Sequence, residues 1–193
     1  GDNPGLQTGV RVFVCMGGGF FGVGGPTART GTSAPIVALD DVLGIDMEVD
    51  WTLSSTYHPR PVRQGHFITE DLTEPLDTGE HPGDMLPTGE NVEVLDFEGG
   101  SLRLATNTYG QGRAVYIAGL PYSAQNSRLL LRAIFWAAHD EAGLASVYCS
   151  DNPEVEVAWY PNVGRVFVYN NSPAAQVASI EGPSSLEVSL PGF

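Results

Sequence analysis

Hydrophobic and polar positions divide the first part of the chain into short elements. Residues 10–16 are apolar apart from one arginine and rich in β-branched side chains, which predicts a strand, although a helix ending at the following glycines fits equally well. Residues 20–23 form a short apolar run, typical of a buried strand. Residues 35–43 predict a short helix, with Pro35 near its start and Gly44 as its stop.

The middle of the chain combines a long polar segment with a hairpin and a helix. Residues 56–100 are rich in Pro, Gly, Asp, Glu and Thr and show little periodicity, so we predict a long packing or functional loop. Residues 101–107 and 113–118 flank a Gly-Gln-Gly turn and predict a β-hairpin. Residues 123–140 carry apolar side chains at helical spacing after a serine N-cap, which predicts a helix.

After Gly143 the pattern changes to short β-type stretches separated by turn residues. These stretches predict the strands of a small antiparallel β domain: residues 155–159, 165–169, 176–180 and 186–190. We therefore place a domain boundary near residue 144. The predicted fold class is α/β, with an α/β layer in residues 1–143 followed by a small antiparallel β domain in residues 144–193.

Charge and composition narrow the class of protein. The net charge is −14, from 23 acidic residues against nine arginines and no lysine, which argues against a nucleic-acid partner. No apolar run approaches the roughly 20 residues of a membrane-spanning helix, and no signal peptide is seen, so we expect no membrane partner and a cytoplasmic location. We expect Cys15 and Cys149 to be isolated, buried thiols, with a disulfide left open, and the Cys and His spacings predict no metal site.

A glycine cluster near the N-terminus permits several interpretations. Gly17, Gly19 and Gly22 form a literal G-x-G-x-x-G, but a dinucleotide site needs a helix beginning at the glycines, and the residues that follow are too rich in Gly and Pro. A P-loop is excluded because the chain has no lysine. We favour a structural role, in which glycine lets the backbone approach a neighbouring element closely. Alternatively, the amides of Gly18 and Gly19 face a cleft and help to bind an anion.

Several stretches together carry a family resemblance that none carries alone. The main ones are residues 17–24 (GGGFFGVG), 41–46 (DVLGID) and 107–123 (NTYGQGRAVYIAGLPYS), and residues 66–69, 126–134, 152–161 and 169–171 continue the match. In this order they resemble the 1,3-β-galactosyl-N-acetylhexosamine phosphorylases, also called lacto-N-biose or galacto-N-biose phosphorylases. Two features depart from the family: Gly25 stands where a Glu is usual, and the segment before the glycines, helical in the family, is β-branched here.

The resemblance implies an organisation and a reaction. Family members have an N-terminal (β/α)₈ barrel, a central α/β domain similar to class I glutamine amidotransferases, and a C-terminal β domain; this chain resembles the second half of the central domain plus the β domain. The reaction is inverting phosphorolysis of β-1,3-galactosyl-N-acetylhexosamine to galactose 1-phosphate and N-acetylhexosamine. Inorganic phosphate is the co-substrate, and no other cofactor is implied.

The same resemblance implies that the catalytic acid and the sugar-binding residues lie on the barrel, outside this chain. We therefore assign no catalytic residue and expect the chain to be inactive alone. Its implied partners are the missing barrel and, through the whole enzyme, the disaccharide. Positive charge gathers at Arg60, Arg63 and His66, so we expect these residues, with Gly18 and Gly19, to lie near substrate or phosphate. The alternative is that the two arginines pair with nearby acids.

Two other functions stay open from the sequence. One is a free-standing amidotransferase-like domain that serves oligomerisation or sugar binding, and the exposed edge of a half-sheet makes a homodimer a candidate. The other is an amidotransferase-type enzyme with a cysteine nucleophile at a sharp strand-to-helix turn. Cys15 precedes the glycine turn instead of occupying it, and this position argues against the second function.

Overall fold

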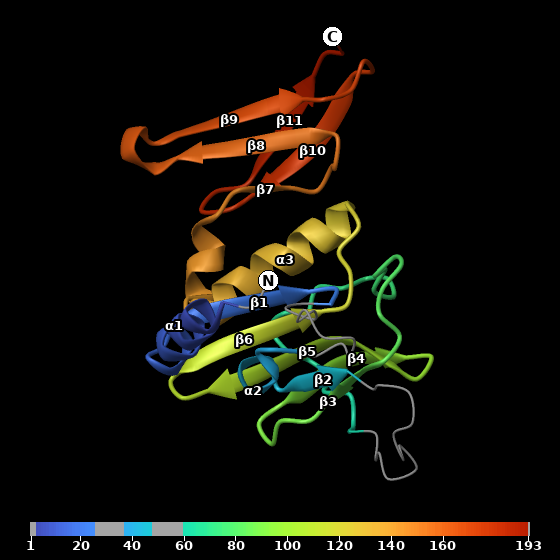
Figure 1. Cartoon of the computed structure of the whole chain (residues 1–193). Helices are drawn as coiled ribbons and strands as arrows, with labels where there is room; N and C mark the ends of the chain where they lie inside the picture. The colour runs from blue at the N-terminus through green and yellow to red at the C-terminus, as the bar shows by residue number, and fades with distance from the viewer. Residues whose placement is uncertain (1–2, 26–36, 48–59, 193) are drawn as a thin grey trace. The chain divides into compact units, whose positions relative to one another are not determined.

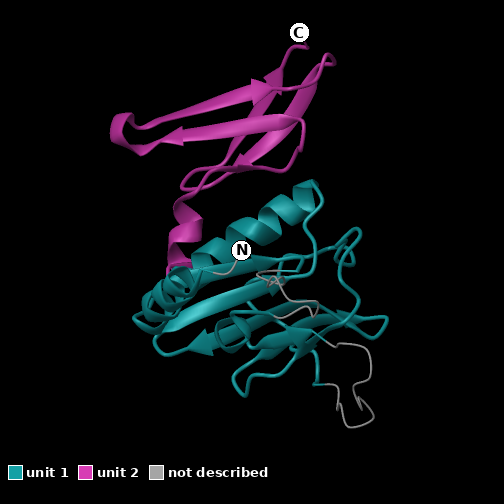
Figure 2. Ribbon diagram, in the orientation of Figure 1, with its two compact units in different colours: residues 1–139 teal, residues 140–193 magenta. Residues whose placement is uncertain are grey.

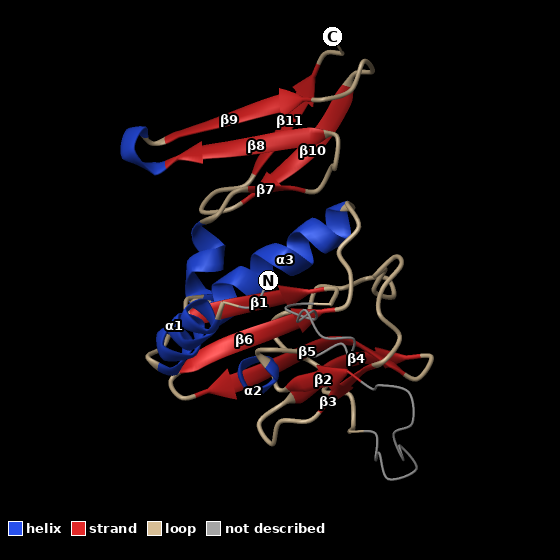
Figure 3. Ribbon diagram, in the orientation of Figure 1, coloured by secondary structure: helices blue, strands red, loops and turns tan. Residues whose placement is uncertain are grey.

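The computed structural model describes residues 3–25, 37–47 and 60–192, and the chain divides into two compact units, residues 1–139 and 140–193 (Figures 1 and 2). Unit 1 is mixed α/β, whereas unit 2 is built from short antiparallel strands (Figure 3). Among the helices in the described residues, none has the length and apolar character that crossing a membrane requires.

A four-stranded sheet forms the centre of unit 1. Its order is β1 (Gly19–Val23), β6 (Gly112–Ile117), β5 (Ser101–Tyr109) and β4 (Glu93–Glu98). β1 runs parallel to β6, with Gly19 opposite Arg113, and the other neighbours are antiparallel. The strand and the hairpin are confirmed, but the expected burial of the strand is wrong: β1 lies at an edge of the sheet, its two phenylalanines are half-buried and Val23 is 46% exposed. Gly110 adopts a φ of 61° in the β5–β6 turn, a conformation that favours glycine.

Helix α1 (Pro4–Cys15) precedes the sheet, so the strand predicted at residues 10–16 is wrong and the alternative, a helix ending at the glycines, is right. Asn3 caps the helix, because its side chain accepts a hydrogen bond from the first turn at 3.2 Å. Val14 is fully buried in the core, and this burial outweighs the low helix propensity of β-branched residues. Cys15 is exposed, so the expected burial of its thiol is wrong.

A short helix and a strand follow the first gap in the described residues. Helix α2 (Asp40–Leu43) covers only the end of the helix predicted at residues 35–43, and residues 35 and 36 lie outside the described residues. Gly44 ends the helix as predicted, in the left-handed conformation with a φ of 68°. Strand β2 (Ile45–Met47) begins directly after this glycine, so one residue reverses the helix into the strand.

The long loop predicted for residues 56–100 is wrong where strands interrupt it. Strand β3 (Met85–Pro87) pairs with β2, and β4 forms one edge of the central sheet. Val62 forms a bridge with Val94 of β4, so the residues around Val62 run along the outer edge of the sheet. Acidic residues at both ends of β4 and inside it hide its apolar positions, which explains why composition alone suggested a loop.

Helix α3 (Ala124–Ala137) confirms the helix predicted at residues 123–140. Ser123 is the N-cap, as expected, and its Oγ accepts a hydrogen bond from the first turn at 3.1 Å.

Alternate residues of β6 divide the core of unit 1, because successive side chains point to opposite faces of a sheet. Val115 packs in the same cluster as Leu129 of α3, whereas Tyr116 packs in the cluster that includes residues of α1 and α2.

Unit 2 confirms the strands predicted after residue 143. Its elements are η2 (Glu141–Ser146), β7 (Cys149–Ser150), β8 (Val155–Tyr160), η3 (Pro161–Val163), β9 (Arg165–Asn170), β10 (Gln176–Glu181) and β11 (Leu186–Leu190). β8 and β9 form a hairpin, and β10 lies between β11 and β7, with every pair antiparallel. Ile180 and Ala178 of β10 share a small core with Val157 and Val168 of the hairpin.

Candidate functional site

His66 ends the segment of residues 60–66, which runs along the edge of the sheet beside β4. Its side chain is buried, with only 4% exposed. Its Nδ1 accepts a hydrogen bond from the backbone N–H of Ile68 at 3.1 Å, which leaves the ring proton of the neutral form on Nε2. Nε2 lies 3.9 Å from a carboxylate oxygen of Glu93. The ring also packs against Trp136 of α3, with 5.4 Å between the centroids. These contacts fix the orientation of the imidazole.

The two arginines of this segment are both engaged within the protein. Arg63 forms an ion pair with Glu93, so the alternative that it pairs with a nearby acid is confirmed. Arg60 instead donates from Nη1 to the backbone carbonyls of Gly89 at 2.6 Å and Val92 at 3.2 Å. Arg60 therefore fastens the turn that leads into β4.

Gly18 and Gly19 lie where the ends of two helices converge. A Cβ on Gly18 would lie 2.3 Å from the ring of Phe13, and one on Gly19 would lie 2.8 Å from the carbonyl oxygen of Ala137. This close approach agrees with the structural role favoured from the sequence. α1 and α3 both end here, and the C-terminus of a helix carries partial negative charge. That charge disfavours an anion beside the glycine amides, and their role in phosphate binding stays a prediction.

The last turn of α3 connects the two parts of the predicted site. Trp136 packs against His66 on one side, and the guanidinium of Arg113 lies 4.8 Å from its ring centroid. Arg113 also donates to the carbonyl of Trp136 at 2.6 Å, which offsets the negative end of the helix. Because Arg113 lies opposite Gly19 in the sheet, the glycine turn and the His66 segment lie at the same end of unit 1. Sequence reasoning missed Trp136, Arg113 and Glu93, since each looks like an ordinary helix or strand residue.

Asp41, one of two adjacent carboxylates after the glycine cluster, is held by a cation and a phenol. Its side chain accepts from Nε of Arg11 at 2.8 and 3.0 Å and from the Tyr109 hydroxyl at 3.2 Å. Burial raises the pKa of Asp41, but the hydrogen bonds and charge of Arg11 outweigh that effect, so the net pKa lies below its usual value. A carboxyl that stays ionised is a poor general acid.

We expect the Arg11–Asp41 pair to stabilise the fold only at pH values at which Asp41 is ionised. Because the folded-state pKa of Asp41 is lowered, its contribution is present above the unfolded value of 3.8 and is lost as the pH falls through the folded pKa. Both side chains are about a third exposed, at 32% and 39%, so the contribution is at most about 1 kcal/mol.

Urea unfolding of Asp41→Asn against wild type at pH 7 and pH 3 checks this expectation. The difference should be present at pH 7 and shrink at pH 3. Asp84→Asn, which removes an exposed carboxyl, is the control and should leave the unfolding free energy nearly unchanged at both pH values. A constant difference for Asp41→Asn at both pH values would contradict the lowered pKa.

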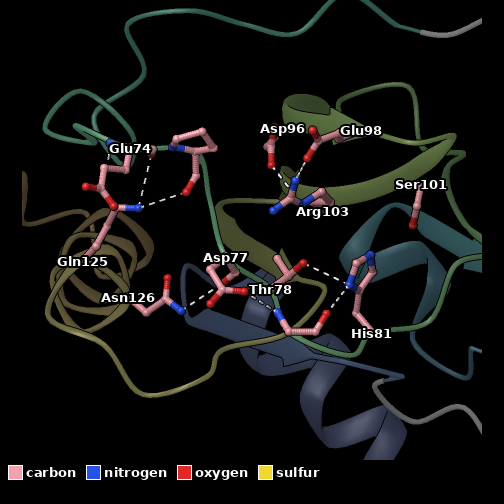
Figure 4. Close-up of polar contacts among 12 residues, drawn as sticks. Glu74, Asp77, Thr78, His81, Asp96, Glu98, Ser101, Arg103, Gln125 and Asn126 are labelled. Atoms are coloured by element: carbon pink, nitrogen blue, oxygen red, sulfur yellow. Dashed lines mark hydrogen bonds and ion pairs between the residues drawn. The ribbon is translucent and has the colours of Figure 1, made fainter.

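The segment before β3 is fastened to the first turn of α3 (Figure 4). The Asn126 amide donates to the carbonyl of Asp77 at 2.9 Å, and Gln125 accepts from the N–H of Glu74 and donates to its carbonyl at 3.2 and 3.3 Å. Thr78, which is 2% exposed, follows Asp77 and lies over the end of β6. Helix side chains therefore hold this segment against the sheet.

The pKa of Asp96 is raised, and a raised pKa is one mark of a general acid. Burial raises it, and the charge of Arg103 only partly offsets the effect. Arg103 lies 3.3 Å from Asp96 and also pairs with Glu98, as Figure 4 shows. These contacts form a structural ion network at one edge of the central sheet, and they assign no catalytic role to Asp96.

Comparison with protein families settles the relationship of this chain. Residues 2–142 match the family model of the lacto-N-biose phosphorylase central domain, and residues 148–193 match that of the lacto-N-biose phosphorylase C-terminal domain. The chain belongs to the lacto-N-biose phosphorylase family. The resemblance stated from the sequence is therefore confirmed, in the same order along the chain.

Curated members of the lacto-N-biose phosphorylase family are much longer than this chain. The 1,3-β-galactosyl-N-acetylhexosamine phosphorylase of Bifidobacterium longum subsp. longum is 39% identical over 209 residues, covering 92% of this chain and 28% of the relative. A protein of the same name from Lachnoclostridium phytofermentans is 36% identical over 188 residues, covering 97% of this chain and 25% of the relative. The chain thus spans about a quarter of the length of these relatives.

Solved structures of other proteins are similar in fold to this chain. The cold-adapted β-galactosidase from Rahnella sp. R3 aligns with a TM-score of 0.55 at 21% identity, covering 98% of this chain and 29% of that chain. Gan42B, a GH42 β-galactosidase, aligns with a TM-score of 0.52 at 14% identity, covering 99% of this chain and 29% of that chain. At these identities the likeness shows a shared fold alone.

In this member of the lacto-N-biose phosphorylase family, the predicted site residues all contact other parts of the same chain. Arg60, Arg63 and His66 contact the turn before β4 or β4 itself, and Gly18 and Gly19 lie against helices. Among the residues that the structure describes, no group of three His, Cys, Asp or Glu side chains could hold a metal ion. A place near substrate or phosphate stays a prediction for all five residues.

Proposed function

We propose that residues 1–193 serve as the central and C-terminal domains of a phosphorylase that cleaves β-1,3-galactosyl-N-acetylhexosamine with inorganic phosphate. The products are galactose 1-phosphate and N-acetylhexosamine. The observation that carries this proposal is the ordered match to both family domains, together with 36–39% identity to relatives named 1,3-β-galactosyl-N-acetylhexosamine phosphorylase. The part that breaks the bond lies outside this chain, and these residues support it.

The pairing of acidic side chains with arginines supports a structural role for this chain. Phosphorolysis needs a single general acid, since phosphate is already an anionic nucleophile, whereas an inverting hydrolase needs two carboxyl groups. Asp41 is held by Arg11, and the adjacent carboxylates Glu70 and Asp71 both contact Arg132. Each of these carboxylates is therefore engaged by an arginine of the same unit, as expected of structural ion pairs.

We further propose that the α/β layer of residues 1–143 is the second half of an amidotransferase-like domain. Support comes from the parallel pairing of β1 with β6 and from α3, which follows β6 and packs on the sheet. Helices cover both faces of this sheet, α3 on one and α1 with α2 on the other. Rigidity of this kind suits a domain that positions another one.

A chimeric enzyme tests the proposed function. We expect phosphorolysis when residues 1–193 replace the matching region of the Bifidobacterium longum relative, measured as galactose 1-phosphate formed from lacto-N-biose and phosphate. Residues 1–193 alone should form none above the background. Turnover by the isolated chain near the ordinary enzymatic value of about 10 per second, or a folded chimera without activity, would overturn the proposal.

The same chimera tests whether the Arg60–His66 segment lies near substrate. We expect Arg60→Ala and His66→Ala to raise the KM for phosphate or disaccharide, because a cation or ring positioned near the ligand contributes to binding. Arg128→Ala, which removes a half-exposed arginine of α3, is the control and should leave KM unchanged. Unchanged kinetics for both test variants would remove this segment from the substrate's surroundings.

A further inference from the structure

The β8–β9 hairpin of unit 2 has one buried face and one exposed face. The buried face contributes Val157 and Val168 to the core of the unit, and Trp159 packs against Tyr148 with 5.1 Å between the ring centroids. The register places the other side chains in three cross-strand pairs: Glu156–Tyr169, Ala158–Phe167 and Tyr160–Arg165. We call these six residues the outer hairpin face. Its three aromatic side chains are 52–58% exposed, which is unusual for a group of large apolar residues.

The outer hairpin face carries opposite charges at its two ends. Glu156 lies in the first cross-strand pair beside Tyr169, and Arg165 lies in the third beside Tyr160, with the Ala158–Phe167 pair between them. Four residues of extended strand separate the two pairs, which is about 13 Å and too far for an ion pair within one chain. In the part of the chain that the structure describes, every other arginine contacts an acid or a carbonyl, whereas Arg165 has no such partner.

We propose that the outer hairpin face binds the same face of a second copy of this chain. A two-fold axis across the strands, through the Ala158–Phe167 pair, brings the Glu156 end of each copy opposite the Arg165 end of the other. The arrangement is self-complementary: an acid–base contact lies at each end of the face, and the aromatic residues form a cluster around the central Phe167. Tyr160 and Phe167 already pack edge to face within one copy, at 5.3 Å between centroids, so part of that cluster is preformed.

The size of the face sets the strength of this association. A stable interface buries about 800 Å² on each partner, and six strand residues supply less than that. We therefore expect a dimer that forms and dissociates with concentration. A galactoside is a competing occupant, because sugars stack on aromatic rings. It would use the rings but leave the placement of opposite charges at the two ends unexplained.

Charge reversal tests the pairing in the full 193-residue chain. Sedimentation velocity across a concentration series at physiological salt should show a reversible dimer. Arg165→Glu and Glu156→Arg should each raise the dissociation constant by at least about tenfold, because like charges then meet twice across the axis. The double variant carrying both changes restores opposite charges and should return to within about threefold of wild type.

Tyr122→Ser is the control, since it removes a 90% exposed aromatic residue outside the outer hairpin face, and it should leave the dissociation constant unchanged. Circular dichroism checks that each variant is folded. A wild-type chain that stays monomeric, single variants that dimerise normally, or a double variant that fails to recover would each overturn the proposal. Tyrosine fluorescence that responds to galactose in a monomeric chain would assign the face to a sugar instead.

Discussion

Replacement of Gly119 by alanine is expected to lower the free energy of unfolding by about 2–4 kcal/mol. Gly119 follows β6, and a Cβ there would lie 1.9 Å from the carbonyl oxygen of Thr78, far inside contact distance. The clash is between two backbone segments, so no side chain can rotate away to relieve it. Asp77, the neighbour of Thr78, is tied to Asn126 of α3 by a 2.9 Å hydrogen bond, and a shift of the segment would strain that bond as well.

Urea unfolding measures this effect, with Gly83→Ala as the matched control. Gly83 follows the Thr78 segment in the sequence and has no positive φ, and a Cβ added to it would meet no atom within 4 Å. The control should therefore unfold at the wild-type urea concentration or slightly above it. Equal midpoints for Gly119→Ala and Gly83→Ala would show that the segment before β3 moves freely, and that the contacts in Figure 4 do not restrain it.

The elements that could be predicted from the sequence are those set by neighbouring residues. Ser123 caps α3 through a contact within the first helical turn, and the turn at Gly110 closes the β5–β6 hairpin locally. The strands of unit 2 alternate between buried and exposed positions with turn residues between them, so their limits fall within about one residue of the prediction. Local signals are sufficient in these cases because tertiary contacts do not oppose them.

The elements that could not be predicted depend on contacts far along the chain. Val14 favours a strand by propensity, but it reaches the core from a helix, and only packing decides between the two. The candidate site shows the same dependence, because His66 contacts Trp136 and Gly19 lies against Ala137, and each pair is far apart in the sequence. The family resemblance identified the domains, but it carried no information about these pairings.

Replacement of Arg132 by alanine is expected to lower the free energy of unfolding by about 3 kcal/mol or more. Its side chain is 10% exposed, pairs with Glu70 and lies 3.5 Å from Asp71. Nε donates to the carbonyl of Phe67 at 2.5 Å, and the guanidinium lies 4.2 Å from the Phe67 ring centroid. Removing this cation leaves the Phe67 carbonyl without its donor and leaves Asp71 with only the half-exposed Arg128 beside it, so the cost exceeds that of the lost packing.

Arg128 supplies a control on the same helix face, one turn earlier. It also lies 3.5 Å from Asp71, but its side chain is 49% exposed, so Arg128→Ala should cost less than about 1 kcal/mol. Urea unfolding of both variants therefore compares a buried with an exposed arginine that share an acid. If the two substitutions cost the same, water already screens the acids around Arg132, and the segment carrying Phe67, Glu70 and Asp71 is held to α3 by apolar contacts alone. A large difference places the attachment of that segment, and with it the burial of His66, on this one guanidinium.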